Sequence, residues 1–260
     1  MTVQRPDIWN HESGPFDIVG DVHGCAKELD KLLEKLGYEL NSRGPRGQRT
    51  TRIRHPKNRI LILAGDLVDR GPVSMDVLRF AMQAEKDGIA KCVIGNHDDK
   101  FLRWLMGRDV QVTKSLQTTI DEAAHEKPKF LNDARCYLES LPSHLILDQG
   151  KLIVAHAGLP EKYHGIESRS SRAFAMFGET TGQTDDLGFP IRRDWARNYR
   201  GKAIVVHGHV AEKKVRHVNN VWSLDTGCVY GHKLTALRWP EMEIVQVKAK
   251  KDWFPHPRFS

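Results

Sequence analysis

Five short polar clusters in this chain carry side chains of the kinds that bind metal ions and phosphate, and each cluster directly follows an apolar run. The clusters are Gly20-Asp21-Val22-His23-Gly24, Gly65-Asp66-Leu67-Val68-Asp69-Arg70-Gly71, Gly95-Asn96-His97, His156-Ala157-Gly158 and Gly208-His209. Carboxylate, imidazole and amide ligands without thiolate suit manganese, iron, zinc or cobalt. The sequence therefore predicts one metal site assembled from distant parts of the chain.

The carboxylate of the second cluster is the natural ligand to share between two ions. Two metals about 3.5–4 Å apart need a common carboxylate, and we expect Asp66 to be this bridge. Each residue alone has an ordinary structural explanation. Asp21, Asp66 and Asn96 are of types that favour helix N-caps, and a histidine at a strand end is commonly a hydrogen-bonded core residue. The joint pattern favours the metal site over these separate explanations.

Short runs rich in valine and isoleucine supply the elements that position the clusters. Such runs are typical of buried strands in a covered sheet, and they cover residues 16–19, 59–64, 90–94, 152–155 and 203–206. A leucine stripe at helical spacing ends before Gly37, and residues 73–86 carry a second helical stripe. Alternating strands and helices predict a layered α/β fold.

The region from residue 99 to residue 147 has a different pattern. It lacks strand signals, and its helical stripes predict a helical cap on a single domain of residues 1–260. Beyond this region, β-like pieces return at 217–224, 233–239 and 243–247. The basic tail after Ala249 is expected to be loose.

The order of the five clusters resembles that of the calcineurin-like metallophosphoesterases, and closely that of their phosphoprotein phosphatase branch. This resemblance implies an α/β fold, a β-sandwich flanked by helices in four layers. It also implies two divalent metal ions that activate a water against phosphorus, manganese first, with iron, zinc, nickel or cobalt as alternatives. The implied ligands of the two ions are Asp21, His23 and Asp66 for the first, and Asp66, Asn96, His156 and His209 for the second.

The same resemblance implies catalytic roles for three further residues. His97 protonates the leaving group, Asp69 orients and polarises it, and Arg70 clamps phosphate oxygens. General chemistry agrees, because imidazole has a suitable intrinsic pKa for proton donation and arginine makes planar, bidentate contacts to phosphoryl groups. The structural alternative is an ion pair between Arg70 and Asp69.

A narrower resemblance concerns residues 190–195, 201–203 and 224–231. They look like the same segments in bacterial bis(5'-nucleosyl)-tetraphosphatases of the asymmetrical type, and the phosphatase module of bacterial polynucleotide kinase-phosphatases shares much of the pattern. This resemblance implies a second phosphate clamp from Arg192 or Arg193, with Arg193 preferred, and places Asp225 in the pocket lining. The leading expectation is asymmetrical hydrolysis of diadenosine tetraphosphate.

Three other hypotheses stay open: a serine/threonine protein phosphatase, a nucleic-acid end phosphatase and a catalytically silent binding module. Protein phosphatases of the resembling branch usually carry Glu and Gly where this chain has Asp98 and Ala157, which disfavours a dedicated protein phosphatase. The chain has no kinase P-loop, so it cannot be the fused repair enzyme. The complete ligand set argues against a silent module.

The composition predicts a basic protein without membrane segments. A formal net charge of +7 favours polyanionic partners, and the acid-free stretch 43–59 is either a solvated hairpin or a basic rim for substrate. Four cysteines form no Cys-x-x-Cys pair, and no apolar run reaches the roughly 20 residues of a bilayer span. The first residues show no signal pattern, so we expect a cytoplasmic protein. Trp104 and Trp195 are expected to pack rather than stack on a base.

Overall fold

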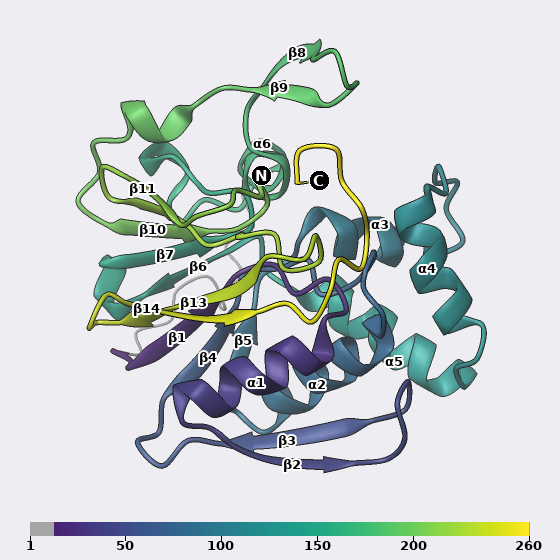
Figure 1. Ribbon diagram of the computed structural model, residues 1–260. Helices are drawn as coiled ribbons and strands as arrows, with labels where there is room; N and C mark the ends of the chain where they lie inside the picture. The colour runs from purple at the N-terminus through teal and green to yellow at the C-terminus, as the bar shows by residue number, and fades with distance from the viewer. Residues whose placement is uncertain (1–12, 260) are drawn as a thin grey trace.

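The computed structural model describes residues 13–259, and two five-stranded sheets lie at its centre (Figure 1). The first sheet has the order β14-β13-β1-β4-β5, and its strands are β1 (Phe16–Val19), β4 (Ile60–Leu63), β5 (Ala90–Cys92), β13 (Lys233–Trp239) and β14 (Glu243–Lys248). The second has the order β11-β12-β10-β7-β6, and its strands are β6 (His144–Leu147), β7 (Leu152–Ala155), β10 (Ile204–His207), β11 (Arg216–Val218) and β12 (Val221–Ser223).

The two sheets pack through apolar side chains that alternate along their strands. Phe16 and Ile18 of β1, Ile62 of β4, Val154 of β7 and Val206 of β10 belong to one buried cluster between the sheets. Strands β1, β4 and β5 run parallel, as do β7, β10 and β12. The carboxyl ends of parallel strands meet at one edge, where open α/β sheets bind ligands. All five polar clusters follow such ends.

Helices cover the outer faces of the sandwich. Helix α1 (Ala26–Leu36) packs on β13 and β14, and α2 (Ser74–Lys86) packs on β5. Helix α6 (Arg169–Phe177) lies over the second sheet, and its Ala175 belongs to a buried cluster with Ile153 and Val205. Gly37 ends α1 in the left-handed conformation (φ 97°), as the stop signal predicted. The predicted sandwich flanked by helices is confirmed.

The segment expected to be a helical cap contains three helices and one strand. Helices α3 (Asn96–Leu105), α4 (Lys114–Ala123) and α5 (Pro128–Ser140) agree with the prediction, but residues 144–147 form β6, which pairs with β7. The prediction of no strand here was wrong, because a four-residue apolar run has no periodicity that separates helix from strand. Figure 1 shows α4 and α5 beside the first sheet rather than over the second one.

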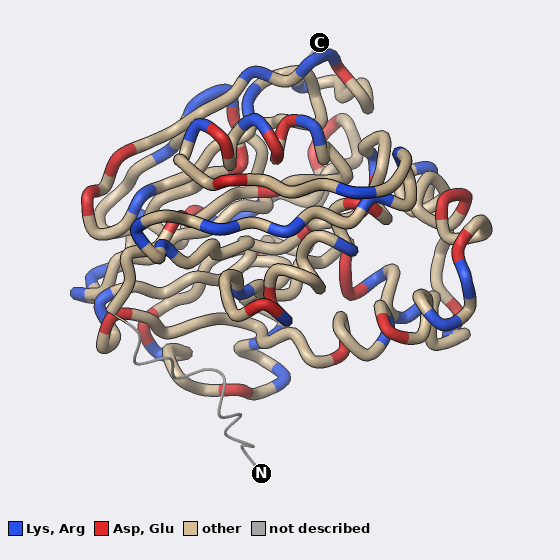
Figure 2. Tube along the Cα trace, turned by 90° about the horizontal axis from the view of Figure 1, so that it is seen from below, with Lys and Arg blue, Asp and Glu red and all other residues tan. Residues whose placement is uncertain are grey.

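The acid-free stretch 43–59 includes the end of β2 (Glu39–Arg43), the turn of the hairpin, β3 (Thr50–Arg54) and the loop that leads to β4. Its arginines bind acids from elsewhere: Arg49 pairs with Asp30, and the buried Arg59 pairs with Asp17 at 3.0 Å. Figure 2 shows basic and acidic residues interspersed along the trace. These pairs agree with the hairpin interpretation and weaken that of a free basic rim.

The tail after Ala249 is packed, so the expectation of a loose tail was wrong. The Trp253 amide donates to Val229 O at 3.0 Å, and the ring of Phe259 stacks on Tyr230 with centroids 5.0 Å apart. The tail is held by aromatic residues spaced along it. The expectation failed because it rested on the basic composition of the tail and not on these aromatic residues.

The two tryptophans considered for base stacking pack within the protein. Trp104 stacks on Phe101 with centroids 5.8 Å apart, and Trp195 contacts Phe174 and Tyr199 edge-on at 5.9 Å each. Between residues 13 and 259, the structure has no helix that is both long and apolar enough to span a bilayer. The expected absence of a signal pattern concerns residues 1–21, of which residues 1–12 lie outside the described residues.

Candidate metal centre

The polar clusters of both sheets converge at one edge of the sandwich. Residues of these clusters adopt left-handed backbone conformations that non-glycine residues seldom take: His23 (φ 44°), Asp66 (49°), Asp69 (74°), Arg70 (68°) and His209 (70°). Such conformations concentrate at functional sites, because the surrounding structure has to enforce them. The backbone therefore turns sharply at five of the residues that present side chains to the site.

Asp66 lies at the centre of the converging side chains. Its Oδ2 is 3.5 Å from Nε2 of His23 and 3.3 Å from Nε2 of His156. Two groups of potential ligand atoms, each with all members within 4.8 Å of one another, share this carboxylate: His23, Asp66 and His97 form one, and Asp66, His156 and His209 form the other. A shared carboxylate between two groups is the arrangement that a pair of ions requires.

The imidazoles of the site are oriented by backbone carbonyls. Nδ1 of His23 lies 2.8 Å from Val68 O, and Nδ1 of His156 lies 2.9 Å from Ala64 O. Each Nδ1 faces a carbonyl oxygen that can accept its proton, so Nε2 is the ring nitrogen that faces the site and is available to a metal ion. Asn96 Oδ1 is 3.0 Å from Nε2 of His156, and Nδ1 of His209 is 3.1 Å from the same atom.

Asp21 joins the site less closely than the other expected ligands. Its two carboxylate oxygens accept the backbone N–H of His209 at 3.0 and 3.1 Å, and Oδ2 is 4.0 Å from Nε2 of His23. Glycine is required at position 208, because a Cβ there would lie 1.8 Å from Asp21 Oδ1. The loops of β1 and β10 thus interlock across the two sheets.

The side chains of His97 and Arg70 contact each other beside Asp66. Nδ1 of His97 donates to Asp69 Oδ2 at 2.6 Å. The guanidinium of Arg70 donates to Nε2 of His23 at 2.6 Å and to Nε2 of His97 at 2.8 Å. Arg70 therefore points into the site rather than pairing with Asp69, which argues against the structural alternative raised by the sequence.

Burial and mutual proximity shift the pKa values of the buried acids and imidazoles. Burial, then the charge of Asp225, raises the pKa of Asp21 well above its usual value. Burial disfavours a charge on His156, but the carboxylates of Asp66 and Asp21 outweigh it and raise the pKa of His156 to about 10. Burial, followed by the charge of His156, lowers the pKa of His209. Carboxylates held this close in the interior are stabilised by positive charge.

A cavity of about 480 Å³ opens onto this group of residues. Asp66, Arg70, Asn96, His97 and His209 line its floor, and further residues of the wall are considered below. The floor therefore joins both groups of ligand atoms to one space large enough for a phosphorylated small molecule.

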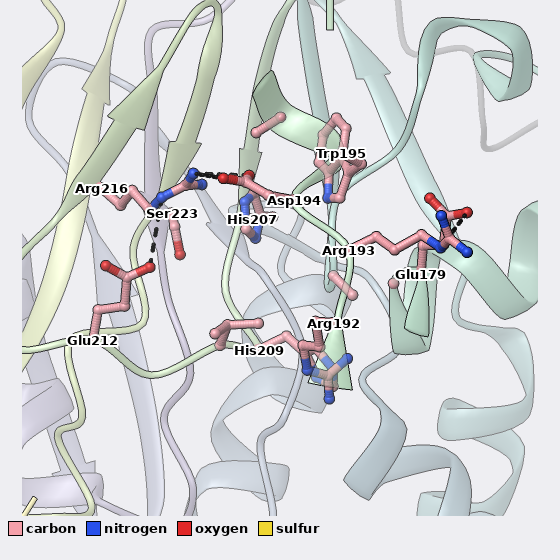
Figure 3. A pocket seen from close by; sticks show the side chains of 14 residues that line it. Glu179, Arg192, Arg193, Asp194, Trp195, His207, His209, Glu212, Arg216 and Ser223 are labelled. Carbon is pink, nitrogen blue, oxygen red and sulfur yellow. Dashed lines mark hydrogen bonds and ion pairs between the residues drawn. The ribbon is translucent and has the colours of Figure 1, made fainter. Parts of the chain in front are cut away.

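The two arginines predicted as a second clamp take different directions. Arg192 lines the cavity, and in the neighbouring pocket drawn in Figure 3 it lies beside His209, whose pKa its charge helps to lower. Arg193 points away and pairs with Glu179 at 3.6 Å (Figure 3). The geometry thus favours Arg192. Asp225 is buried and accepts the Gly227 amide at 3.0 Å, and burial raises its pKa to about 6.

Two residues that the sequence analysis did not assign to the site hold it together. Asp98 accepts the amides of Leu67 at 2.9 Å and Gly95 at 3.0 Å, and so ties the loops after β4 and β5 to each other. Thr119 of α4 donates to Asp69 Oδ1 at 2.6 Å. A signal existed for Asp98, since it stands at the third position of α3, where acids cap the helix. Nothing in the sequence near Thr119 points to Asp69.

The donor set of the site fits a pair of divalent cations. Carboxylate, imidazole and amide atoms converge without thiolate. Nε2 of His209 is buried and has no hydrogen-bond partner within the described part of the chain. A buried nitrogen without a partner is costly, and a bound ion would satisfy it.

Comparisons with known proteins agree with this geometry. A family model described as calcineurin-like phosphoesterase matches residues 14–237. The chain belongs to this family. It is 43% identical over 236 residues, which are 89% of its length and 93% of the relative's, to a protein of Anoxybacillus flavithermus named bis(5'-nucleosyl)-tetraphosphatase PrpE [asymmetrical].

Solved structures show how widely the calcineurin-like phosphoesterase fold is shared. A crystal structure provisionally described as a diadenosine tetraphosphatase has a TM-score of 0.64 and 25% identity, over 93% of this chain and 97% of the other. A protein serine/threonine phosphatase from Saccharomyces cerevisiae has a TM-score of 0.58 and 15% identity, over 94% and 82%. The second likeness concerns the fold alone.

The family membership confirms the predicted metal-dependent phosphoesterase class. Calcineurin-like phosphoesterases use a binuclear centre of divalent ions, and this chain has candidate aspartate and histidine ligand groups for one.

Proposed function

We propose that this calcineurin-like phosphoesterase hydrolyses dinucleoside polyphosphates asymmetrically, with diadenosine tetraphosphate as its leading substrate. The observation that carries the proposal is the position of Asp66 between two groups of ligand atoms, on the floor of a cavity that also holds Arg70 and Arg192. Relatives of about 40% identity named as asymmetrical tetraphosphatases support the nucleotide over protein or nucleic-acid ends.

In this proposal Asp21, His23 and Asp66 hold one divalent ion, and Asp66, Asn96, His156 and His209 hold the other. Manganese is the proposed ion, with iron, zinc, nickel and cobalt as alternatives. When bound, such ions supply Lewis-acid activation of water and of the phosphoryl group. The Nε2 atoms that His23 and His156 direct toward Asp66, with Nδ1 facing carbonyls at 2.8 and 2.9 Å, support these assignments.

The remaining roles belong to side chains of the cavity floor. Arg70 holds phosphate oxygens with the two guanidinium nitrogens that here contact His23 and His97, and Arg192 supplies a second positive contact from the wall. Once Arg70 turns from Nε2 of His97 to phosphate, Nε2 can carry a proton and donate it to the leaving oxygen, while Asp69 accepts Nδ1–H and fixes the ring. Neither Arg193 nor Asp225, the other two residues expected at the substrate, lines this cavity: Arg193 pairs with Glu179, and Asp225 is buried.

The proposed compartment is the cytoplasm. The four cysteines Cys25, Cys92, Cys136 and Cys228 are free, as expected where thiols are kept reduced.

A substrate panel tests the proposal. The purified protein, supplemented in turn with manganese, nickel, iron or zinc, is assayed for kcat/KM on diadenosine tetraphosphate, a phosphopeptide, a 3'-phosphorylated oligonucleotide and p-nitrophenyl phosphate. We expect the highest kcat/KM on diadenosine tetraphosphate, with AMP and ATP as products. A preference for the phosphopeptide or the oligonucleotide refutes the substrate, and no turnover with any metal refutes the enzyme.

A further inference from the structure

Four aromatic rings from three distant segments meet in the wall of the catalytic cavity. Phe189 comes from the hairpin of β8 (Thr180–Thr184) and β9 (Pro190–Arg192), Tyr230 follows β12, and His256 and Phe259 belong to the tail. Ring centroids lie 4.9 Å apart for Phe189 and His256, 4.8 Å for Tyr230 and His256, and 5.0 Å for Tyr230 and Phe259. The rings form one continuous aromatic wall.

This wall belongs to the same cavity as the metal centre. The cavity of about 480 Å³ has Asp66 and His97 on its floor and the four rings on its wall, with Arg70, Arg192 and Arg258 as further lining residues. Arg70 lies 5.6 Å from the centroid of the Tyr230 ring, so the guanidinium on the floor is adjacent to the aromatic wall. If a ligand bound with a phosphate at the floor, the part of the ligand attached to that phosphate would lie against the rings.

The rings differ in how much of their surface the protein covers. Tyr230 is buried, whereas Phe189, His256 and Phe259 are only half-buried, and Ile191 beside them in the cavity is 39% exposed. Half-covered rings next to an exposed apolar side chain leave flat apolar surface toward the cavity. A purine or pyrimidine ring matches such a surface, because every base has a π-face that stacks on aromatic side chains.

The charge around the wall fits the rest of a nucleotide. Arg258 forms an ion pair with Asp185 and lies 5.0 Å from the centroid of Phe189, which fixes the tail against the hairpin. Arg70 contacts the imidazoles of His23 and His97, and Arg192 donates to Phe177 O. Neither forms an ion pair with a carboxylate within residues 13–259, so both charges are available to phosphate. The wall therefore combines an apolar platform at one end with positive charge at the other.

We propose that Phe189, His256, Phe259 and Ile191 form a nucleobase subsite, in which the base stacks on the tail and hairpin while its phosphates pass Arg192 and Arg70 to the metal centre. The inference deepens the proposed function, because it states which part of the chain recognises the nucleoside. It assigns the tail a direct contact with substrate.

The test measures binding and needs no turnover. Isothermal titration calorimetry of the manganese-supplemented protein compares AMP with ribose 5-phosphate, which lacks only the base. We expect AMP to bind at least about fivefold more tightly, since stacking one base contributes roughly 1–3 kcal/mol, or about five- to 150-fold. Phe259→Ala and Phe189→Ala should reduce this ratio toward one, and Phe259→Trp should preserve it. Leu187→Ala, on the same hairpin but outside the cavity wall, is the matched control.

Three results would overturn the subsite. The first is equal affinity of the wild-type protein for AMP and ribose 5-phosphate. The second is an unchanged ratio of these affinities in both alanine variants. The third is an equal loss of affinity for both ligands, which would give the tail a structural role only. The two proposals fail separately. If diadenosine tetraphosphate is not hydrolysed but the AMP preference and its loss are observed, the subsite stands and the proposed reaction does not.

Discussion

The carboxylate of Asp69 accepts two hydrogen bonds of 2.6 Å, one from Nδ1 of His97 and one from Oγ1 of Thr119. The first bond fixes the orientation and tautomer of the imidazole, and the second holds the carboxylate from α4. The helical segment that the sequence suggested as a cap over the site thus supports the site from beside it.

Replacing His97 should separate proton transfer from metal binding. His97→Ala is expected to lower kcat on diadenosine tetraphosphate by roughly 10²–10⁴-fold, the usual contribution of a general acid, while elemental analysis finds the metal content unchanged. The loss should shrink for p-nitrophenyl phosphate, whose leaving group needs no proton. An equal loss on both substrates would remove His97 from the role of acid.

Replacing Asp66 should abolish metal binding and turnover together. Asp66→Asn keeps the shape of the side chain but removes the charge that lies 3.5 Å from His23 Nε2 and 3.3 Å from His156 Nε2. We expect both ions to be depleted in elemental analysis and activity to fall below detection. Circular dichroism checks that the variant is folded. Two ions retained per chain would exclude the bridging role.

The two neighbouring arginines of the hairpin should differ in their effect on substrate binding. Arg192→Ala is expected to lower kcat/KM by about tenfold or more, because a charge-assisted contact to phosphate contributes roughly 1.5–3 kcal/mol. Arg193→Ala, which loses only an exposed pair with Glu179, should change kcat/KM by less than about threefold. Steady-state kinetics on diadenosine tetraphosphate measure both variants. A larger loss of kcat/KM in Arg193→Ala than in Arg192→Ala would identify Arg193 as the clamp.

A buried histidine away from the metal centre should make stability depend on pH. His144 Nδ1 lies 3.0 Å from Ser143 Oγ, and its Nε2 accepts the Gly165 amide at 3.2 Å, so the folded ring is neutral. Burial, then the charge of His164, lowers the pKa of His144 to about 4. Since the unfolded value is near 6.5, the unfolded chain binds more protons between these two values. The stabilisation is therefore complete above pH 6.5 and is lost as the pH falls toward 4.

Urea unfolding at several pH values measures this effect. The difference in unfolding free energy between wild type and His144→Gln should fall with decreasing pH by at most about 1.4 kcal/mol per pH unit. Taking the difference cancels the contribution of histidines that do not interact with His144. A difference that is constant between pH 6.5 and pH 4 would contradict the prediction.

Much of the sandwich could be predicted because its central strands are apolar on both faces. Leu152–Ala155 is a continuous apolar run, Phe16–Val19 is interrupted only by Asp17, and the polar residues that follow both strands mark the edge of each sheet. Strand β6 was missed, because its antiparallel partner β7 decides its conformation and the four residues alone do not.

Site residues could be predicted where their type and their place after an apolar run reveal their role. They could not be predicted where the role depends on a contact with a residue far away in the sequence. Asp66 and His156 follow apolar runs that any reader of the sequence sees. The bond from Thr119 to Asp69 spans 50 residues and has no local signal. The aromatic wall was hidden for the same reason, because Tyr230 and Phe259 meet only after the tail has folded back.

The left-handed backbone of Asp66, Asp69 and Arg70 has a consequence for protein engineering. Non-glycine residues held in such conformations cost about 1–3 kcal/mol each, and glycine would relieve that cost. A selection for heat resistance alone would therefore favour glycine substitutions at these positions, and the selected variants would be stable but inactive. Thermostable variants of this chain are better sought at the outer surface of α1 and α5, with these three residues held constant.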